Sequence, residues 1–180
     1  MKKTSSVIAL LAFCAALLAG TASAATKPMA GGSSLKFSTG GDQGTYYGFG
    51  GVLAQKISET TSTKVTAITS GGSKANIEAL EDEDAQLGFV QTDVGSYAYD
   101  GTRLFSSKVD CFSTVGNLYM EQVQIVTLNP DIKTVADLKG KNVSVGAPGS
   151  GVYFNAVDVL GAYDMDVKRL TASPPSAIFT

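Results

Sequence analysis

Two glycine-rich turns in this 180-residue chain combine residue types that could bind a negatively charged group. The first turn is GGDQGTYY, residues 40–47, and the second is GAPGSG, residues 146–151. Each turn stands where a predicted strand passes into a predicted helix. The N-terminus of a helix presents unpaired backbone N–H groups and the positive end of the helix dipole. The two turns therefore predict a site for an anionic ligand.

The residue types in the chain argue against catalysis. The chain contains no histidine, which excludes Ser-His-Asp and Cys-His catalysis and zinc sites built from nitrogen and sulfur. Pro148 and Val152 break the G-x-S-x-G frame around Ser150. Neither turn carries the Lys-Ser/Thr pair of a P-loop or the G-x-G-x-x-G order of a dinucleotide site. We therefore predict a protein that is not an enzyme and needs no cofactor.

The first 24 residues read as a secretory signal peptide. Lys2 and Lys3 form a basic start, residues 7–18 are almost entirely apolar, and Ala22-Ser23-Ala24 supplies the small residues of a cleavage site. The apolar run is shorter than the roughly 20 residues that a membrane-spanning helix needs. We expect cleavage near Ala24 and a periplasmic product.

Charge and cysteine content narrow the possible partners. Without residues 1–24 the chain keeps 12 Lys+Arg against 16 Asp+Glu, a net charge of −4, so it lacks the basic patch that nucleic-acid binding requires. The acidic run at residues 81–84 is interpreted as a solvated helix end. Once Cys14 leaves with the signal peptide, Cys111 has no partner for a disulfide. We expect Cys111 to be a small buried side chain beside Phe112.

The first half of the chain alternates between strand and helix patterns, which predicts an α/β fold with a parallel sheet. A glycine within the first helix would suit a helix lying tight against a sheet or a ligand. We expect Ser73 to cap the second helix and Gly101 to end the third. The predicted strands are residues 35–38, 64–69 and 86–90, and the predicted helices are residues 45–59, 74–81 and 93–99.

The second half predicts a further α/β lobe that is incomplete. Thr134 and Asp137 match a capping box. The last helix should place Asn155 and Asp158 on its outer face. Predicted strands cover residues 113–120, 123–128 and 141–145, and the helix covers 153–162. The domain prediction is a signal peptide (1–24), a flexible tether (25–34), a first ligand-binding lobe (35–120), a partial second lobe (121–170) and an irregular tail (171–180).

Four sequence blocks in order resemble the TAXI family of solute receptors that serve TRAP transporters. They are GGDQGTYYGFGGVLAQKI, TSGGSKANIEAL, LGFVQTDVGSYAYDG and DLKGKNVSVGAPGSGVYFNAVDVL. The resemblance covers residues 35–170. It implies a fold similar to type II periplasmic binding proteins, with two α/β lobes that close on a small anionic solute such as glutamate or another organic acid. It also implies transfer of that solute to membrane permease subunits. Relatives continue well past residue 170, so the resemblance implies a truncated chain.

The resemblance also places the ligand-binding residues. The family's first-lobe turn falls on Gly44, Thr45, Tyr46 and Tyr47, and its second-lobe turn falls on Pro148, Gly149, Ser150 and Gly151. Two further blocks between them supply Gly72, Ser73, Asn76, Gln91 and Asp93.

Some roles within this set stay open at the level of sequence. Asp93 suits either a ligand ammonium group or the cap of the following helix. Tyr46 fits the apolar face of its helix, so Tyr47 is the better candidate for ligand contact.

Two other interpretations compete with a solute receptor. The first is an exported interaction or surface protein that uses a receptor-like scaffold, which would bind a protein partner and no small molecule. The second is a fragment of the receptor without function of its own.

Overall fold

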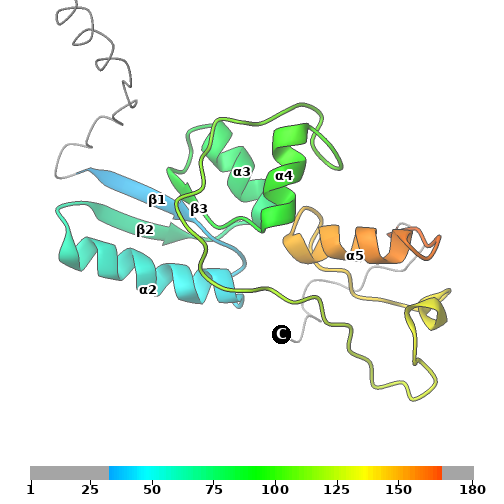
Figure 1. Cartoon of the computed structure of the whole chain (residues 1–180). Helices are drawn as coiled ribbons and strands as arrows, with labels where there is room; N and C mark the ends of the chain where they lie inside the picture. The colour runs from blue at the N-terminus through cyan, green and yellow to red at the C-terminus, as the bar shows by residue number, and fades with distance from the viewer. Residues whose placement is uncertain (1–32, 168–180) are drawn as a thin grey trace, which may run out of the picture. The chain divides into compact units, whose positions relative to one another are not determined.

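The computed structural model describes residues 33–167 of the chain (Figure 1). The predicted signal peptide, nearly all of the predicted tether and the predicted tail lie outside these residues. The elements are β1 (Ser34–Ser38), α2 (Thr45–Thr60), β2 (Lys64–Ile68), α3 (Ser73–Glu81), β3 (Leu87–Gly88), α4 (Thr92–Asp100), the 3₁₀ helix η1 (Val135–Leu138) and α5 (Gly151–Gly161).

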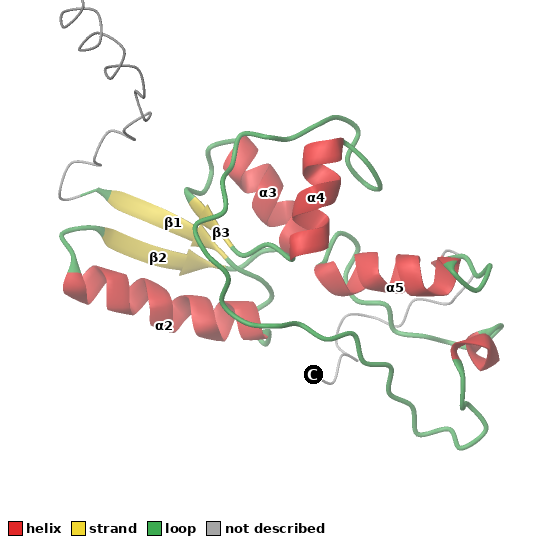
Figure 2. Cartoon of the chain, in the orientation of Figure 1, coloured by secondary structure: helices red, strands yellow, loops and turns green. Residues whose placement is uncertain are grey.

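The three strands form one parallel sheet in the order β2-β1-β3, which confirms the predicted α/β class. Ser34 of β1 pairs with Lys64 of β2, and Phe37 of β1 pairs with Leu87 of β3. Helix α2 packs against β2, whereas α3 packs against β3 and α4 (Figure 2). Parallel strands need crossover connections, and α2 and α3 supply them here.

Three apolar clusters hold the described residues together. One joins the sheet to α2 through Phe37, Ala54, Val65 and Phe89. A second gathers α3, α4 and the start of α5 around Ile77, Val94, Ala98, Phe105, Val109 and Phe154. A third lies in the second half and contains Leu138, Val145, Leu160, Met165 and Val167. Phe154 therefore ties α5 to the first half of the chain.

The ends of the α-helices lie within two residues of the predicted ones, and one predicted cap is wrong. Gly101 has the left-handed conformation, with φ 64°, and ends α4 as predicted. Thr134 and Asp137 form the predicted capping box of η1. The N-cap of α3 is Gly72 and not Ser73. Gly72 has a φ of 99°, a conformation that suits glycine and leaves the serine inside the first helical turn.

The predicted strands of the second half are wrong. Residues 113–128 form no strand, and within residues 141–145 only Val143 makes an isolated bridge. A strand persists only where a neighbour satisfies its backbone N–H and C=O groups, and none of the described strands pairs with residues 113–128. Their apolar side chains consequently stay in solvent, with Val115 93% and Leu128 103% exposed.

Two smaller expectations about exposure had different outcomes. The acidic residues 81–84 are exposed, as the interpretation of a solvated helix end requires. Cys111 is also exposed, so the prediction of a buried side chain is wrong. It lies in the same extended segment as residues 113–128, where no element covers it. Within residues 33–167 no helix is both long and apolar enough to cross a bilayer.

Candidate ligand-binding site

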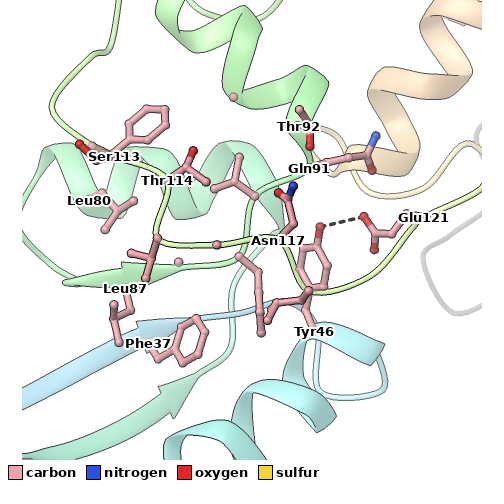
Figure 3. Close-up of a pocket in the computed structure, with 18 of the residues that line it drawn as sticks. Phe37, Tyr46, Leu80, Leu87, Gln91, Thr92, Ser113, Thr114, Asn117 and Glu121 are labelled. Carbon is pink, nitrogen blue, oxygen red and sulfur yellow. Dashed lines mark hydrogen bonds between the residues drawn. The ribbon is translucent and has the colours of Figure 1, made fainter.

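A cavity of about 1120 Å³ lies beside β3, between the sheet and the extended segment of residues 111–123 (Figure 3). Its apolar wall comes from the sheet and from two helices: Phe37, Leu53, Ile57, Leu80, Leu87 and Phe89. Its polar groups include side chains from α2, the β3–α4 connection, α4, the extended segment and α5: Tyr46, Gln91, Asp93, Asn117, Glu121 and Asn155. The cavity thus joins an apolar region to a polar region.

Tyr46 stands in the first turn of α2 and brings its hydroxyl to the polar region. Its ring packs on Phe89 with centroids 5.0 Å apart. Its hydroxyl donates a hydrogen bond to Glu121 Oε2 at 3.0 Å (Figure 3). Burial, and next the charge of Glu121, raise the pKa of Tyr46 well above its ordinary value. Tyr46 therefore stays a hydrogen-bond donor at any physiological pH.

A second tyrosine lies beside the same carboxylate. Burial, followed by the charge of Glu121, raises the pKa of Tyr119 to about 12. The Tyr119 ring packs edge-on against Phe49 with centroids 6.0 Å apart. The two tyrosines, one from α2 and one from the extended segment, accordingly flank Glu121.

Gln91, Asp93 and Asn155 form a closed network of hydrogen bonds between the first half of the chain and α5. Gln91 Nε2 donates to Asp93 Oδ2 at 3.1 Å and to Asn155 Oδ1 at 2.9 Å. Asn155 Nδ2 donates to Asp93 Oδ2 at 2.9 Å. The other carboxylate oxygen, Asp93 Oδ1, accepts from the backbone N–H of Val94 at 2.8 Å. The carboxylate of Asp93 is therefore held by three amide groups.

This network corrects the sequence analysis at α5. Asn155 and Asp158 do not lie on an outer face. Asp158 accepts a hydrogen bond from the Tyr97 hydroxyl at 2.6 Å and pairs with Arg103 at 2.6 Å. The apolar periodicity of α5 gave no sign that both polar residues face α4.

Asn76 connects the loops at the carboxyl ends of the strands. Its side chain is fully buried. Its Oδ1 accepts from Ser38 Oγ at 2.6 Å and from Ser70 Oγ at 2.5 Å. Its Nδ2 donates to the carbonyl oxygens of Thr39 at 2.6 Å and Phe89 at 2.7 Å. One amide thereby sets the relative positions of three strand ends.

Ser73 also helps to hold the loops at the strand ends in place. Its side chain is fully buried, and its Oγ accepts a hydrogen bond from the backbone N–H of Gln91 at 3.1 Å. The contact orients the β3–α4 connection, which carries Gln91 to the cavity.

The second glycine turn packs against the loop between β2 and α3. The backbone N–H of Lys74 donates to the Gly149 carbonyl at 3.1 Å. A Cβ at Gly72 would lie 3.3 Å from Ser150 Cα, and a Cβ at Gly151 would overlap the Gln91 side chain. Ser150 is the N-cap of α5, since its Oγ accepts from the Tyr153 N–H at 3.2 Å. Glycine at these positions permits the close approach.

The predicted site residues therefore fall into two groups. Tyr46, Gln91 and Asp93 line the cavity. The others lie outside its lining, in the glycine-rich loops or on α2, α3 and α5: Gly44, Thr45, Tyr47, Gly72, Ser73, Asn76, Pro148, Gly149, Ser150 and Gly151. Tyr46, which the sequence analysis ranked below Tyr47, packs on Phe89 and also lines the cavity, whereas Tyr47 is not among the lining residues.

Sequence reasoning missed the residues that the extended segment contributes. Asn117, Tyr119 and Glu121 all line the cavity. These residues lie within or between two predicted strands. The alternation of apolar and polar residues there shows neither that a side chain contacts a ligand nor that it bonds to a residue of α2. No group of three or more His, Cys, Asp or Glu within residues 33–167 is arranged to hold a metal ion.

One comparison with known proteins bears on this arrangement. The sequence model of the NMT1-like family matches residues 37–177, which is most of the chain and includes all of the described strands except the start of β1. This is a family of proteins similar to periplasmic binding proteins. The match spans both glycine turns and the cavity.

Proposed function

Because the chain belongs to the NMT1-like family, a family of binding proteins and not of enzymes, we propose that it is a solute receptor of the TAXI type. In this proposal it captures a small carboxylate, such as glutamate or a related organic acid, outside the cytoplasm. It then delivers the solute to the permease subunits of a TRAP transporter. The family match supports the coarser part, a solute-binding role in an extracytoplasmic location.

The observation that carries the proposal is the cavity beside β3, whose polar region, lined by Tyr46 and Gln91 among others, lies beyond the carboxyl end of that strand (Figure 3). In parallel α/β sheets, ligands bind beyond the carboxyl ends of the strands. The Tyr46 hydroxyl already donates to one carboxylate, that of Glu121, at 3.0 Å. Because the hydroxyl has a single proton, a solute carboxylate would accept this bond in place of Glu121.

The proposal predicts that organic acids stabilise the folded chain. A ligand that binds only the native state at about 100 times its Kd adds about 2.7 kcal/mol to the free energy of unfolding. Thermal unfolding of the exported protein would be measured with a panel of amino acids and mono- and dicarboxylates. We expect Tm to rise with at least one of them. No change in Tm across the whole panel would contradict the receptor function.

A substitution at Ser150 tests whether the second glycine turn belongs to the solute site. Aspartate caps helices as well as serine does, so Ser150→Asp should keep α5 intact while adding a negative charge to the turn. We expect weaker binding of the carboxylate found in the panel, by about tenfold, as measured by isothermal titration calorimetry. Unchanged affinity, with an unchanged Tm of the free protein, would remove this turn from the site.

An exported interaction protein remains the second candidate, and one observation favours it. Residues 113–128 carry apolar side chains that are largely in solvent, among them Met120 at 86% and Val126 at 77% exposure. Contiguous exposed apolar surface marks interaction sites. Binding of a protein partner together with a flat response to the acid panel would select this function.

A further inference from the structure

The charges around the cavity are all of one sign. Its lining includes three carboxylates, those of Glu83, Asp93 and Glu121, and none of its lining residues is a lysine or an arginine. The ion pairs among the described residues, Lys74 with Glu78 and Arg103 with Asp158, involve none of the three. A solute that carries only negative charge would meet unbalanced carboxylates here. A solute that also carries a positive group would not.

Of the three carboxylates, Glu121 is the one placed to meet such a group. Asp93 is held by Gln91, Asn155 and the Val94 N–H, and so serves the network with α5. Glu83 lies ahead of β3, where its carbonyl accepts from Gln86 Nε2. Glu121 lies at the polar region, where the Tyr46 hydroxyl donates to it. A neutral hydroxyl does not neutralise a carboxylate, so a cation at this point would gain a charge-assisted hydrogen bond.

Two aromatic side chains, Tyr46 and Tyr119, lie beside the same carboxylate and belong to a larger group of rings. Tyr46 and Phe49 both pack on Phe89, with centroids 5.0 and 6.2 Å apart, and Tyr119 packs on Phe49 at 6.0 Å. Phe49 is 44% and Tyr119 40% exposed, so these rings remain accessible to a ligand. Aromatic faces attract ammonium groups through their quadrupole. A carboxylate beside accessible aromatic rings is a combination that binds protonated amines.

We propose that Glu121, together with the rings of Tyr46 and Tyr119, binds the protonated amine of the solute, so that the preferred solutes are amino acids with their ammonium group and not simple organic acids. This inference rests on the proposed receptor function and adds the second charged group of the solute. It also reassigns the ammonium contact, which sequence analysis offered to Asp93, to a residue of the extended segment. The apolar wall of Phe37, Leu53 and Leu87 would then face an uncharged part of the solute.

Matched pairs of probes test the inference directly. Leucine and isocaproate differ only in the ammonium group, as do glutamate and glutarate. Affinities for all four would be measured by isothermal titration calorimetry on the wild-type chain, on Glu121→Gln and on the control variant Glu83→Gln. Glu121 is exposed and glutamine has nearly its shape, so the variant should fold, which an unchanged circular dichroism spectrum and Tm would verify.

We expect the wild-type chain to bind one or both amino acids about tenfold or more tightly than the matched acid. In Glu121→Gln the ratio of the affinity for the amino acid to that for the matched acid should fall to about threefold or less. In Glu83→Gln this ratio should stay at its wild-type value. Equal affinity within both pairs for the wild type would overturn the ammonium site and leave the carboxylate receptor standing. A preference that survives in Glu121→Gln would also overturn the assignment to this residue. No binding of any of the four probes would contradict the inference, and failure of the wider acid panel would contradict the receptor function itself.

Discussion

Replacing Asn76 by aspartate is expected to lower the free energy of unfolding by about 3–5 kcal/mol. The side chain is fully buried, and its Nδ2 donates to the carbonyls of Thr39 and Phe89. Aspartate has the same shape but no N–H, so a carboxylate would face two carbonyl oxygens without a cation nearby. Because this burial raises the pKa of the introduced carboxyl, the loss should shrink as pH falls and the protonated group regains one donor.

Urea unfolding of the wild type and the variant, at neutral and at acidic pH, measures this effect. Asn129→Asp is a matched control, since Asn129 is exposed and its Oδ1 only accepts a hydrogen bond, from the Asp131 N–H at 2.9 Å. Aspartate can accept that bond equally well, so the change in stability should stay within about 0.5 kcal/mol. A similarly small change for Asn76→Asp would show that this amide does not hold the strand ends together.

Replacing Gly50 by alanine is expected to destabilise the chain by about 1–3 kcal/mol. A Cβ at Gly50 would lie 2.6 Å from Thr39 Cγ2 and 3.1 Å from Phe89 Cε2. Thr39 is fully buried, and its Oγ1 donates to the Ile68 carbonyl at 2.6 Å, which hinders its rotation. Helix α2 would therefore have to move away from the sheet.

The same helix supplies a control with the opposite expected sign. A Cβ at Gly48 would meet nothing within 4 Å. Gly48→Ala should therefore raise stability, by up to about 1 kcal/mol, because alanine is the better helix former. Thermal and urea unfolding of the two variants would be compared. Destabilisation by both substitutions, or by neither, would contradict the close packing of α2 on Thr39 and Phe89 at Gly50.

The sequence predicted the position of α2 but not which of its glycines allows close packing. The three glycines concerned are Gly48, Gly50 and Gly51. Apolar spacing placed the helix at residues 45–59, and the structure has it at Thr45–Thr60. The expectation that glycine permits tight packing is confirmed at Gly50, while Cβ atoms at Gly48 and Gly51 would meet nothing. Periodicity reports which face of a helix is apolar, but the depth of contact depends on which side chains the sheet presents.

For the candidate site, too, the sequence predicted one part and only the structure revealed the other. Turn residues at the strand ends predicted where ligand-facing loops would gather, because all parallel strands end at one edge of a sheet. Of the residues that this reasoning named, Tyr46 and Gln91 line the cavity. Asn76 was assigned to the ligand, yet its four hydrogen bonds go to the chain itself. From sequence alone, a polar residue that binds a ligand cannot be told from one that holds the chain together. Its hydrogen-bond partners distinguish the two.

The sequence by itself determined the α/β alternation of the first half, the ends of most helices and the absence of residues for histidine-dependent catalysis. These follow from local preferences and composition, which act within a few residues. Only the tertiary structure decided that residues 113–128 pair with none of the described strands, that the Tyr46 hydroxyl lies 3.0 Å from Glu121 Oε2, and that Asn155 joins Gln91 and Asp93. Each of these depends on contacts between segments far apart in the chain, and no local pattern encodes which distant group a side chain meets.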